Sequence, residues 1–279
     1  DESSFNANLV SDIRSILGNY RSDATLYLGG PTMITSDMMD FIRSDLVLFG
    51  TAVALIFALM LYLFFGNIWL VILPLLNAFA TTFITAGFLG FMDWKVSVVS
   101  SNFIALLLIL TISLTVHVLV KINELKKEHN DYKEALSDSI NQMFLPCFFA
   151  ALTTAIAFLS LLLGDLKPVI EFGKMMAFGI TIAFISTFTF LPSLLSVIGN
   201  TSTKDRLNLH KITNSILEIS KSRTSVIYIL FSLSFVALIF GASKLEVENR
   251  FIDYFDKNTE IHQGMLEIDK HLGGTSTLD

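Results

Sequence analysis

Charged residues are scarce in this sequence: Asp, Glu, Lys and Arg make up 16% of its 279 residues, against about 25% in an average soluble domain. Hydrophobic residues make up 53%, and the mean hydropathy is +0.64. This composition excludes a disordered tail and is not that of a typical soluble enzyme. The formal net charge of −6 gives no reason to expect nucleic acid as a partner.

Cysteine is almost absent as well. The single Cys147 lies inside an apolar run, which excludes a disulfide framework and any multi-cysteine zinc site. The sequence also has no phosphate-binding loop, no nucleophile motif and no cluster of metal-ligand residues. We therefore expect no cofactor, no metal, no catalytic residue and no enzymatic activity such as ATP hydrolysis.

The sequence has instead six long apolar runs that contain no Asp, Glu, Lys or Arg. A membrane helix needs about 20 mostly apolar residues, and six runs approach or exceed that length: Leu46–Phe65, Trp69–Phe91, Ser97–Val120, Phe144–Leu163, Met175–Ile198 and Thr224–Gly241. Buried helices of a large soluble protein are the alternative, but six such runs in succession have no polar face for water. The sequence thus predicts a mostly α-helical, polytopic membrane protein.

Lys and Arg predict its orientation, because cytoplasmic loops are enriched in them. The segments 121–143 and 199–223 carry nine of these residues, whereas the hairpins 92–96 and 164–174 carry three. We therefore expect the first two segments on the cytoplasmic side and both ends of the chain on the opposite side.

The N-terminal segment 1–45 has the pattern of an incomplete α+β piece. An apolar stripe at helical spacing predicts a helix that ends at Gly18, and alternation over Thr25–Leu28 predicts a strand. A Gly-Gly-Pro turn follows, and Thr35–Ser44 is expected to form a helix that runs into the first span.

The C-terminal segment 242–279 has a similar pattern. It predicts a strand around Lys244–Val247, a helix over Glu260–Leu272 and a further strand over Thr275–Leu278. Between the spans, apolar residues recur at helical spacing within 199–223. That pattern indicates either an amphipathic helix lying flat on the inner leaflet or a short soluble helix packed on the ends of the spans.

Several stretches, in this order and spacing, resemble the resistance–nodulation–cell division (RND) superfamily of transporters. The similarity is strongest to its MMPL branch of lipid and hydrophobe exporters, which includes hopanoid transporters, and extends more distantly to proteins with a sterol-sensing domain. The stretches are Leu28–Pro31 with the helix ending at Ser44-Asp45, Ala105–Val118 (ALLLILTISLTVHV), Pro146–Leu161 (PCFFAALTTAIAFLSL), Asn249–Phe255 and Gly264–Gly274.

The resemblance implies a larger protein of about twelve spans in two similar halves, each with a periplasmic porter domain after its first span. This chain would be an internal fragment that holds spans two to seven. Its implied parts are the end of the first porter domain (1–45), a five-helix sterol-sensing-like bundle (46–198), a cytoplasmic amphipathic linker (199–223), the first span of the second half (224–241) and the start of the second porter domain (242–279).

The resemblance also implies a function: secondary active export of a lipid-like or hydrophobic molecule from the inner membrane, coupled to an ion gradient. The partners would be that substrate, the bilayer and the second half of the polypeptide, and a homo-oligomer is compatible with this picture. A lipid- or sterol-sensing protein without transport is an alternative, and an accessory subunit for protein translocation is another, because such proteins share the bundle.

The span Ser97–Val120 is the richest in polar residues. At about 100° per residue, Asn102, Ser113 and His117 fall on one face, and Thr111 and Thr115 fall on roughly the opposite face. Ser113 and His117 are four residues apart and therefore neighbours on their face.

Proton-driven members of the family usually carry, in this span, a Gly-x-Asp pattern followed four residues later by His. The matching positions here are Thr111, Ser113 and His117, so the histidine is kept and the carboxylate is replaced by serine. Serine does not titrate near neutral pH, whereas histidine does. His117, Ser113 and Asn102 are thus the candidates for a proton relay. In the alternative, His117 hydrogen-bonds between helices or reaches the inner interface.

Five further polar residues are candidates for lining a substrate path: Thr111, Thr115, Thr153, Thr154 and Asn77. Threonine hydroxyls in helices commonly bond back to their own backbone, and Asn77 lies near Pro74, where it could bond to freed backbone groups. Small residues four apart, such as Ala78 and Thr82 or Gly179 and Ala183, predict close helix packing.

Overall fold

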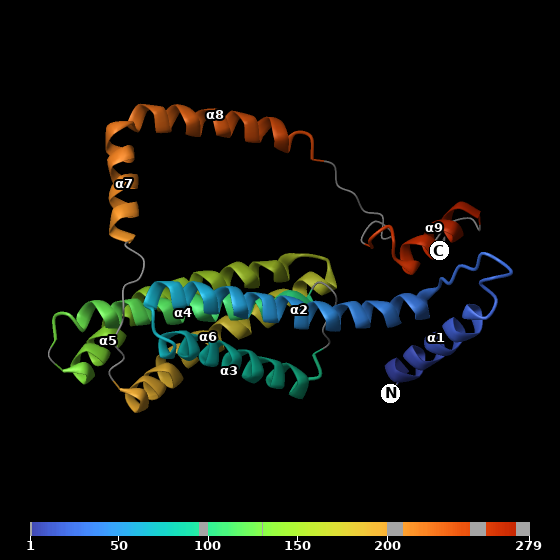
Figure 1. The fold of residues 1–279 in the computed structure, drawn as a ribbon, viewed down its shortest axis with the longest axis horizontal. Helices are drawn as coiled ribbons and strands as arrows, with labels where there is room; N and C mark the ends of the chain where they lie inside the picture. The colour runs from blue at the N-terminus through green and yellow to red at the C-terminus, as the bar shows by residue number, and fades with distance from the viewer. Residues whose placement is uncertain (1, 95–99, 130, 200–208, 246–254, 272–279) are drawn as a thin grey trace. The chain divides into compact units, whose positions relative to one another are not determined.

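The computed structural model describes residues 2–94, 100–129, 131–199, 209–245 and 255–271. The elements assigned in these residues are all helices (Figure 1). The chain divides into two compact units, one of residues 42–207 and one of residues 1–41 together with 208–279.

Six helices are long and apolar enough to cross a membrane, which agrees with the six spans expected from the sequence. They are α2 (Pro31–Phe65), α3 (Trp69–Phe91), α4 (Phe103–Leu125, preceded by the 3₁₀ turn η1, Ser100–Asn102), α5 (Tyr132–Leu159, continued by η2, Ser160–Leu163), α6 (Lys167–Ile198) and α8 (Thr224–Ala242). The predicted continuity of the first span with the helix before it is confirmed, because α2 is a single helix.

Three shorter helices complete the described residues. They are α1 (Glu2–Gly18), α7 (Leu209–Ser222) and α9 (Glu260–His271). Helix α1 ends at Gly18, as predicted, and α9 ends one residue before its predicted end at Leu272. The strand expected over Thr25–Leu28 is not formed, since this segment has no strand partner among the described residues and a lone strand lacks ladder hydrogen bonds. The strand expected over 275–278 and half of that over 244–247 lie outside the described residues.

The helices extend beyond the apolar runs, so the links between them are shorter than expected. The predicted loop 121–143 reduces to residues 126–131, because α4 continues to Leu125 and α5 begins at Tyr132. Asp131 caps α5 by accepting a hydrogen bond from the Lys133 amide at 3.1 Å. Helix α6 starts at Lys167, with proline in its first turn, rather than after residue 174. Charged residues end an apolar run but not a helix.

The helices α4 and α6 form the centre of the bundle. Each of them contacts the other as well as α3 and α5. Half of the most apolar 18-residue window of α4 is buried, against 11% for α5 and 6% for α2, so α2 and α5 lie at the outside of this unit. The large side chains that are almost fully buried come mainly from the inner helices: Leu73, Leu107, Leu108, Ile112, Leu119, Leu191 and Leu195.

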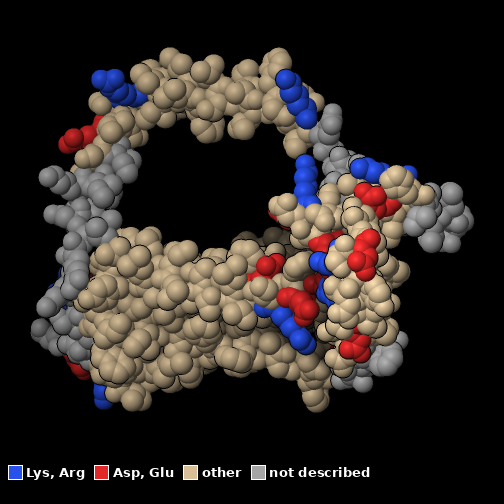
Figure 2. All heavy atoms as spheres, turned by 45° about the vertical axis from the view of Figure 1, so that its right-hand side comes forward, with Lys and Arg blue, Asp and Glu red and all other residues tan. Residues whose placement is uncertain are grey.

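The outer surface of the bundle is apolar. Figure 2 shows no Lys, Arg, Asp or Glu on the visible flank of the bundle between its two ends. Large apolar side chains such as Leu55 and Phe83 are exposed there, at 70% and 76%. Such a surface is suited to the hydrocarbon core of a bilayer, which contains no water.

Small residues let neighbouring helices approach closely at two places on α6. A Cβ placed on Gly179 would lie 3.1 Å from the Leu107 side chain of α4, and a Cβ on Gly173 would lie 2.5 Å from the carbonyl oxygen of Phe158 on α5. Ala183 is fully buried. The predicted close packing is thus confirmed for α6.

We expect Gly173→Ala to lower stability by roughly 1–3 kcal/mol, because the new methyl group meets backbone rather than a flexible side chain. Thermal unfolding of the purified protein in detergent measures the change. Gly87→Ala is the matched control, since no atom lies within 4 Å of a Cβ there and alanine favours the helix. Equal melting temperatures for the two variants would contradict close packing at Gly173.

Candidate functional site in the helix bundle

A hydrogen-bonded network centred on Asn77 joins three helices inside the bundle. Its side-chain amide nitrogen, on α3, donates to Thr115 Oγ1 of α4 at 2.9 Å and to Thr187 Oγ1 of α6 at 3.2 Å. Ser186 Oγ of α6 donates to Asn77 Oδ1 at 2.6 Å. The exposed fractions of Asn77, Thr115 and Thr187 are 0%.

The network satisfies every hydrogen-bonding group of the Asn77 amide except one lone pair of its oxygen. Thr115 also donates to the carbonyl oxygen of Thr111 at 2.8 Å, so it acts as acceptor and donor at once. Hydrogen bonds between side chains take the place of hydrogen bonds to water, because the hydrocarbon core of a membrane contains no water. The expectation that Asn77 bonds to backbone groups near Pro74 is therefore wrong: its side chain bonds to hydroxyl groups of two other helices.

The two faces of α4 have different surroundings. Thr111 and Thr115 are fully buried against the other helices. Asn102, Ser113 and His117 lie on the exposed face. This agrees with the helical periodicity, which places them opposite the buried threonines. The relay candidates thus share one face of α4, but within this unit that face is open rather than packed.

The hydroxyl groups of Thr153 and Thr154 on α5 bond back to their own helix. Thr153 Oγ1 donates to the Phe149 carbonyl at 2.8 Å, and Thr154 Oγ1 donates to the Ala150 carbonyl at 2.7 Å. Their hydrogen bonds show the commoner role for threonine in a helix. Unlike Thr115, neither residue has a hydrogen bond to the Asn77 network, and the bonds of both hydroxyl groups stay within α5.

Sequence reasoning missed several polar residues that face the inside of the bundle. Thr81 and Thr85 follow Asn77 at intervals of four residues on α3, and both are fully buried, as is Thr187 on α6. The four-residue spacing in the sequence could have indicated that these residues share one face of α3. The pairing of α3 with α6 could not have been predicted in this way, because the bonded residues are more than 100 positions apart in sequence.

A second cluster lies in the unit formed by the chain ends. Arg14 on α1 forms two parallel hydrogen bonds with the Asp37 carboxylate at the start of α2, at 2.9 and 2.6 Å. Its Nε donates to Glu260 of α9 at 2.9 Å, and Arg21 donates to the other Glu260 oxygen at 3.1 Å. The hydrogen bond to Asp37 is the main reason why the pKa of Arg14 is raised.

Apolar packing supports these ion pairs. Val10, Met33, Ile261 and Met265 form a small core between α1, α2 and α9. A Cβ on Gly264 would overlap the carbonyl oxygen of Leu28, so glycine is required for α9 to lie this close to the segment before α2. This unit therefore holds together residues from the two ends of the chain.

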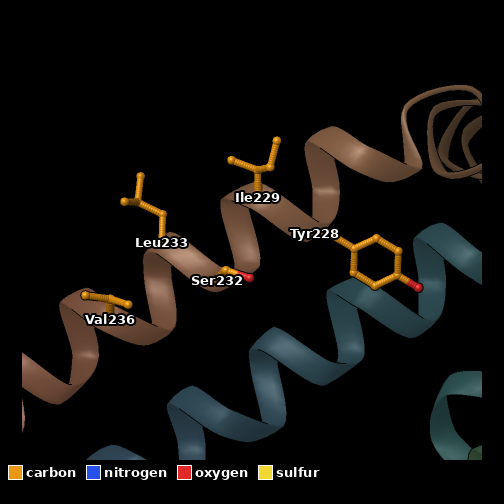
Figure 3. A pocket seen from close by; sticks show the side chains of 5 residues that line it. All are labelled: Tyr228, Ile229, Ser232, Leu233 and Val236. Atoms are coloured by element: carbon orange, nitrogen blue, oxygen red, sulfur yellow. The ribbon is translucent and has the colours of Figure 1, made fainter.

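The helix α8 carries a shallow depression on its own surface. Tyr228, Ile229, Ser232, Leu233 and Val236 line it, and all five come from this one helix (Figure 3). Each side chain is exposed. A depression formed by one helix presents no convergent polar groups, so we do not assign a substrate site to it. Among the described residues no group of three His, Cys, Asp or Glu side chains could hold a metal ion.

These observations define a polytopic helical membrane protein with a neutral polar core and an open polar face on its central helix. The profile of the MMPL family matches residues 2–216, and the chain belongs to this family.

Two relatives place the match in context. A membrane protein of Methanocaldococcus jannaschii is 25% identical over 161 residues, which are 57% of this chain and 42% of that protein. The hopanoid transporter of Rhodopseudomonas palustris is 23% identical over 184 residues, which are 66% of this chain and 21% of that protein. The chain therefore matches less than half the length of either relative.

We expect Asn77→Leu to destabilise the bundle, because it leaves Thr115, Thr187 and Ser186 without their amide partner. Interhelical hydrogen bonds in membranes average about 0.6 kcal/mol each, so the loss of three should cost roughly 2 kcal/mol. Thermal unfolding in detergent measures it. Thr189→Val is the control, since this exposed hydroxyl bonds only to its own helix at Ile185. A melting temperature of Asn77→Leu equal to that of the control would show that the network does not stabilise the bundle.

For the cluster at the chain ends, we expect Arg14 and Glu260 to be energetically coupled. A double-mutant cycle with Arg14→Gln and Glu260→Gln should give a coupling energy of roughly 1–2 kcal/mol, since the pair is partly buried and charge-assisted. Protection of the α9 amides against hydrogen exchange is the measurement. Lys270→Gln, an exposed change on the same helix, should leave that protection unchanged. Additive effects of the two Gln substitutions would refute the coupling.

Proposed function

We propose that this chain is part of a secondary active transporter that exports a lipid-like or hydrophobic molecule from the inner membrane. The observation that carries the proposal is the family match over residues 2–216, and it is supported by the six apolar helices. A relative that is named as a hopanoid transporter supports a polycyclic or other apolar substrate. On this proposal the protein is not an enzyme.

The orientation follows from Lys and Arg, as argued from the sequence. The link between α4 and α5 carries Lys126 and Lys127, and the segment before α8 carries Lys221 and Arg223. We therefore place both links in the cytoplasm, and the α1, α2 and α9 cluster in the periplasm. Burial lowers the pKa of Lys126.

We propose further that the open face of α4 takes part in coupling transport to a proton gradient. In this proposal His117 exchanges the proton, and Ser113 lies one turn away on the same face of α4. Asn102 stands at the other end of the same face. The exposed position of these side chains in this unit supports the idea that they meet a further polar surface, for which the second half of the polypeptide is our candidate.

The roles of the buried threonines follow from this division. Thr115 links α4 to Asn77 of α3, which is itself bonded to α6, and the buried Thr111 hydroxyl bonds to its own helix. On this proposal, α4 therefore moves with α3 and α6 as one body. We therefore expect the substrate to pass elsewhere. In rocking-type transport, a rigid bundle of this kind moves against its counterpart and opens the route to each side in turn.

A lipid sensor without transport is the second candidate. It is favoured by one specific observation: the position at which proton-driven members carry a carboxylate is Ser113 here. Such a protein would bind lipid without moving it against a gradient.

The test is reconstitution of the full-length protein in proteoliposomes that contain a radiolabelled hopanoid and, separately, a labelled phospholipid. An imposed pH gradient should drive directional movement of a lipid probe, and a protonophore should abolish it. Binding without directional movement of either probe would favour the sensor, and movement that ignores the gradient would exclude proton coupling.

In the same assay, we expect His117→Ala to reduce gradient-driven movement at least about tenfold, the loss expected when a proton-transferring group is removed. Ser193→Ala on α6 is the control: this exposed hydroxyl bonds only to the Thr189 carbonyl of its own helix. Wild-type rates for His117→Ala, at equal protein content, would exclude the relay role of His117 while leaving the transport proposal standing.

A further inference from the structure

The Asn77 network sets the relative heights of three helices in the bundle. Because Asn77 bonds to both Thr115 and Thr187, these residues of α3, α4 and α6 lie at one level. This level is polar on all three helices.

A second level lies eight residues further along α3. A Cβ on Gly179 of α6 would lie 3.1 Å from the Leu107 side chain of α4 and 3.5 Å from Thr85 Cγ2 of α3. These positions are eight residues from Thr187, Thr115 and Asn77 respectively. Eight residues of helix rise about 12 Å, so the two levels are separated by the same distance on all three helices.

The middle level follows from this register: it contains Thr81 of α3, Thr111 of α4 and Ala183 of α6. All three residues have an exposed fraction of 0%. Thr81 shares a face of α3 with Asn77 and Thr85, because residues four apart on a helix are neighbours. Alanine on α6 is the smallest side chain that this level could have after glycine.

The hydroxyl group of Thr81 differs from its neighbours. Thr82, Thr85, Thr111 and Thr115 each donate to the carbonyl oxygen four residues earlier in their own helix. The buried Thr81 Oγ1 has no hydrogen-bond partner among the described residues. A buried hydroxyl without a partner is energetically unfavourable, so a ligand that hydrogen-bonds to Thr81 Oγ1 would stabilise the bundle.

The chemistry of the middle level determines which ligand fits. Thr111 Oγ1 gives its hydrogen to the Leu107 carbonyl and keeps lone pairs that can accept a hydrogen bond. Thr81 Oγ1 can both donate and accept. A small neutral molecule with two hydrogens and two lone pairs therefore finds two partners here, which is the minimum for a buried water.

A cation fits less well. The polar side chains that the described structure places on these three levels are neutral: Asn77, Thr81, Thr85, Thr111, Thr115 and Thr187. An ion without a carboxylate partner in a low-dielectric interior would bear an uncompensated desolvation cost.

We propose that a water molecule binds between α3, α4 and α6, hydrogen-bonded to the hydroxyl groups of Thr81 and Thr111, next to Ala183. It extends the Asn77 network by one helical turn toward Gly179. The polar core of the bundle is then continuous over about two helical turns, at the place where α4 presents its opposite, open face to the outside.

The first experiment is a high-resolution structure of the full-length protein. Density within hydrogen-bonding distance of Thr81 Oγ1, about 2.7–3.2 Å, supports the proposal. A Thr81 hydroxyl that instead donates to the Asn77 carbonyl, with no density beside it, overturns the proposal.

The second experiment compares Thr81→Val with Thr85→Val by thermal unfolding in detergent. Both changes replace a buried hydroxyl by a methyl group, but Thr85 loses only a bond to its own helix. If water is bound, Thr81→Val should melt about 2–4 °C below Thr85→Val, the shift typical of losing one hydrogen bond in a protein of about 150–250 residues or more. A Thr81→Val protein that melts at or above the control means that the hydroxyl had no partner to lose, and overturns the proposal.

Discussion

The bundle depends on one constraint: inside hydrocarbon, a polar group must find its partner within the protein. Asn77 is the most polar side chain that the described structure buries completely in the bundle, and three hydroxyl groups from two other helices satisfy it. The helices α3, α4 and α6 must keep one relative height for these bonds to form. Gly179 and Ala183 permit the close approach that this height requires. These bonds therefore set the position of α4 in the bundle and of the side chains that it carries.

That position gives α4 its two faces. The threonines hold the helix from inside, and Asn102, Ser113 and His117 point away from the core. Because α4 is hydrogen-bonded to its neighbours on one side and carries polar side chains on the other, a change in charge at its open face can shift the position of all three bonded helices. Our proposal for proton coupling uses this division, because a change in the charge of His117 would act on α3, α4 and α6 together.

The unit formed by the chain ends uses a different interaction. Where side chains meet water, solvent competes for every hydrogen bond, and single exposed ion pairs contribute little. Arg14 compensates by forming two parallel bonds with the largely buried Asp37 and a third with Glu260, above a small apolar core. Since Asp37 lies in the N-terminal part of α2, Arg14 links α9 to that part of the helix.

The amino-acid sequence was enough to predict the helical membrane class and the six spans, because apolar runs of sufficient length cross a bilayer as helices. The order and spacing of its motifs were enough to predict the family. The sequence also determined that Thr111 and Thr115 lie opposite Ser113 and His117, since the helical period is local. It did not determine where helices end, as the shortened 126–131 link shows, nor that the Thr25–Leu28 segment lacks a strand partner. Only the tertiary structure decided that the threonine face is the buried one, that Asn77 meets Thr187, and that Arg14 meets Glu260. These pairs lie 110 and 246 residues apart, and contacts at such separation depend on how whole helices pack, which no local pattern encodes.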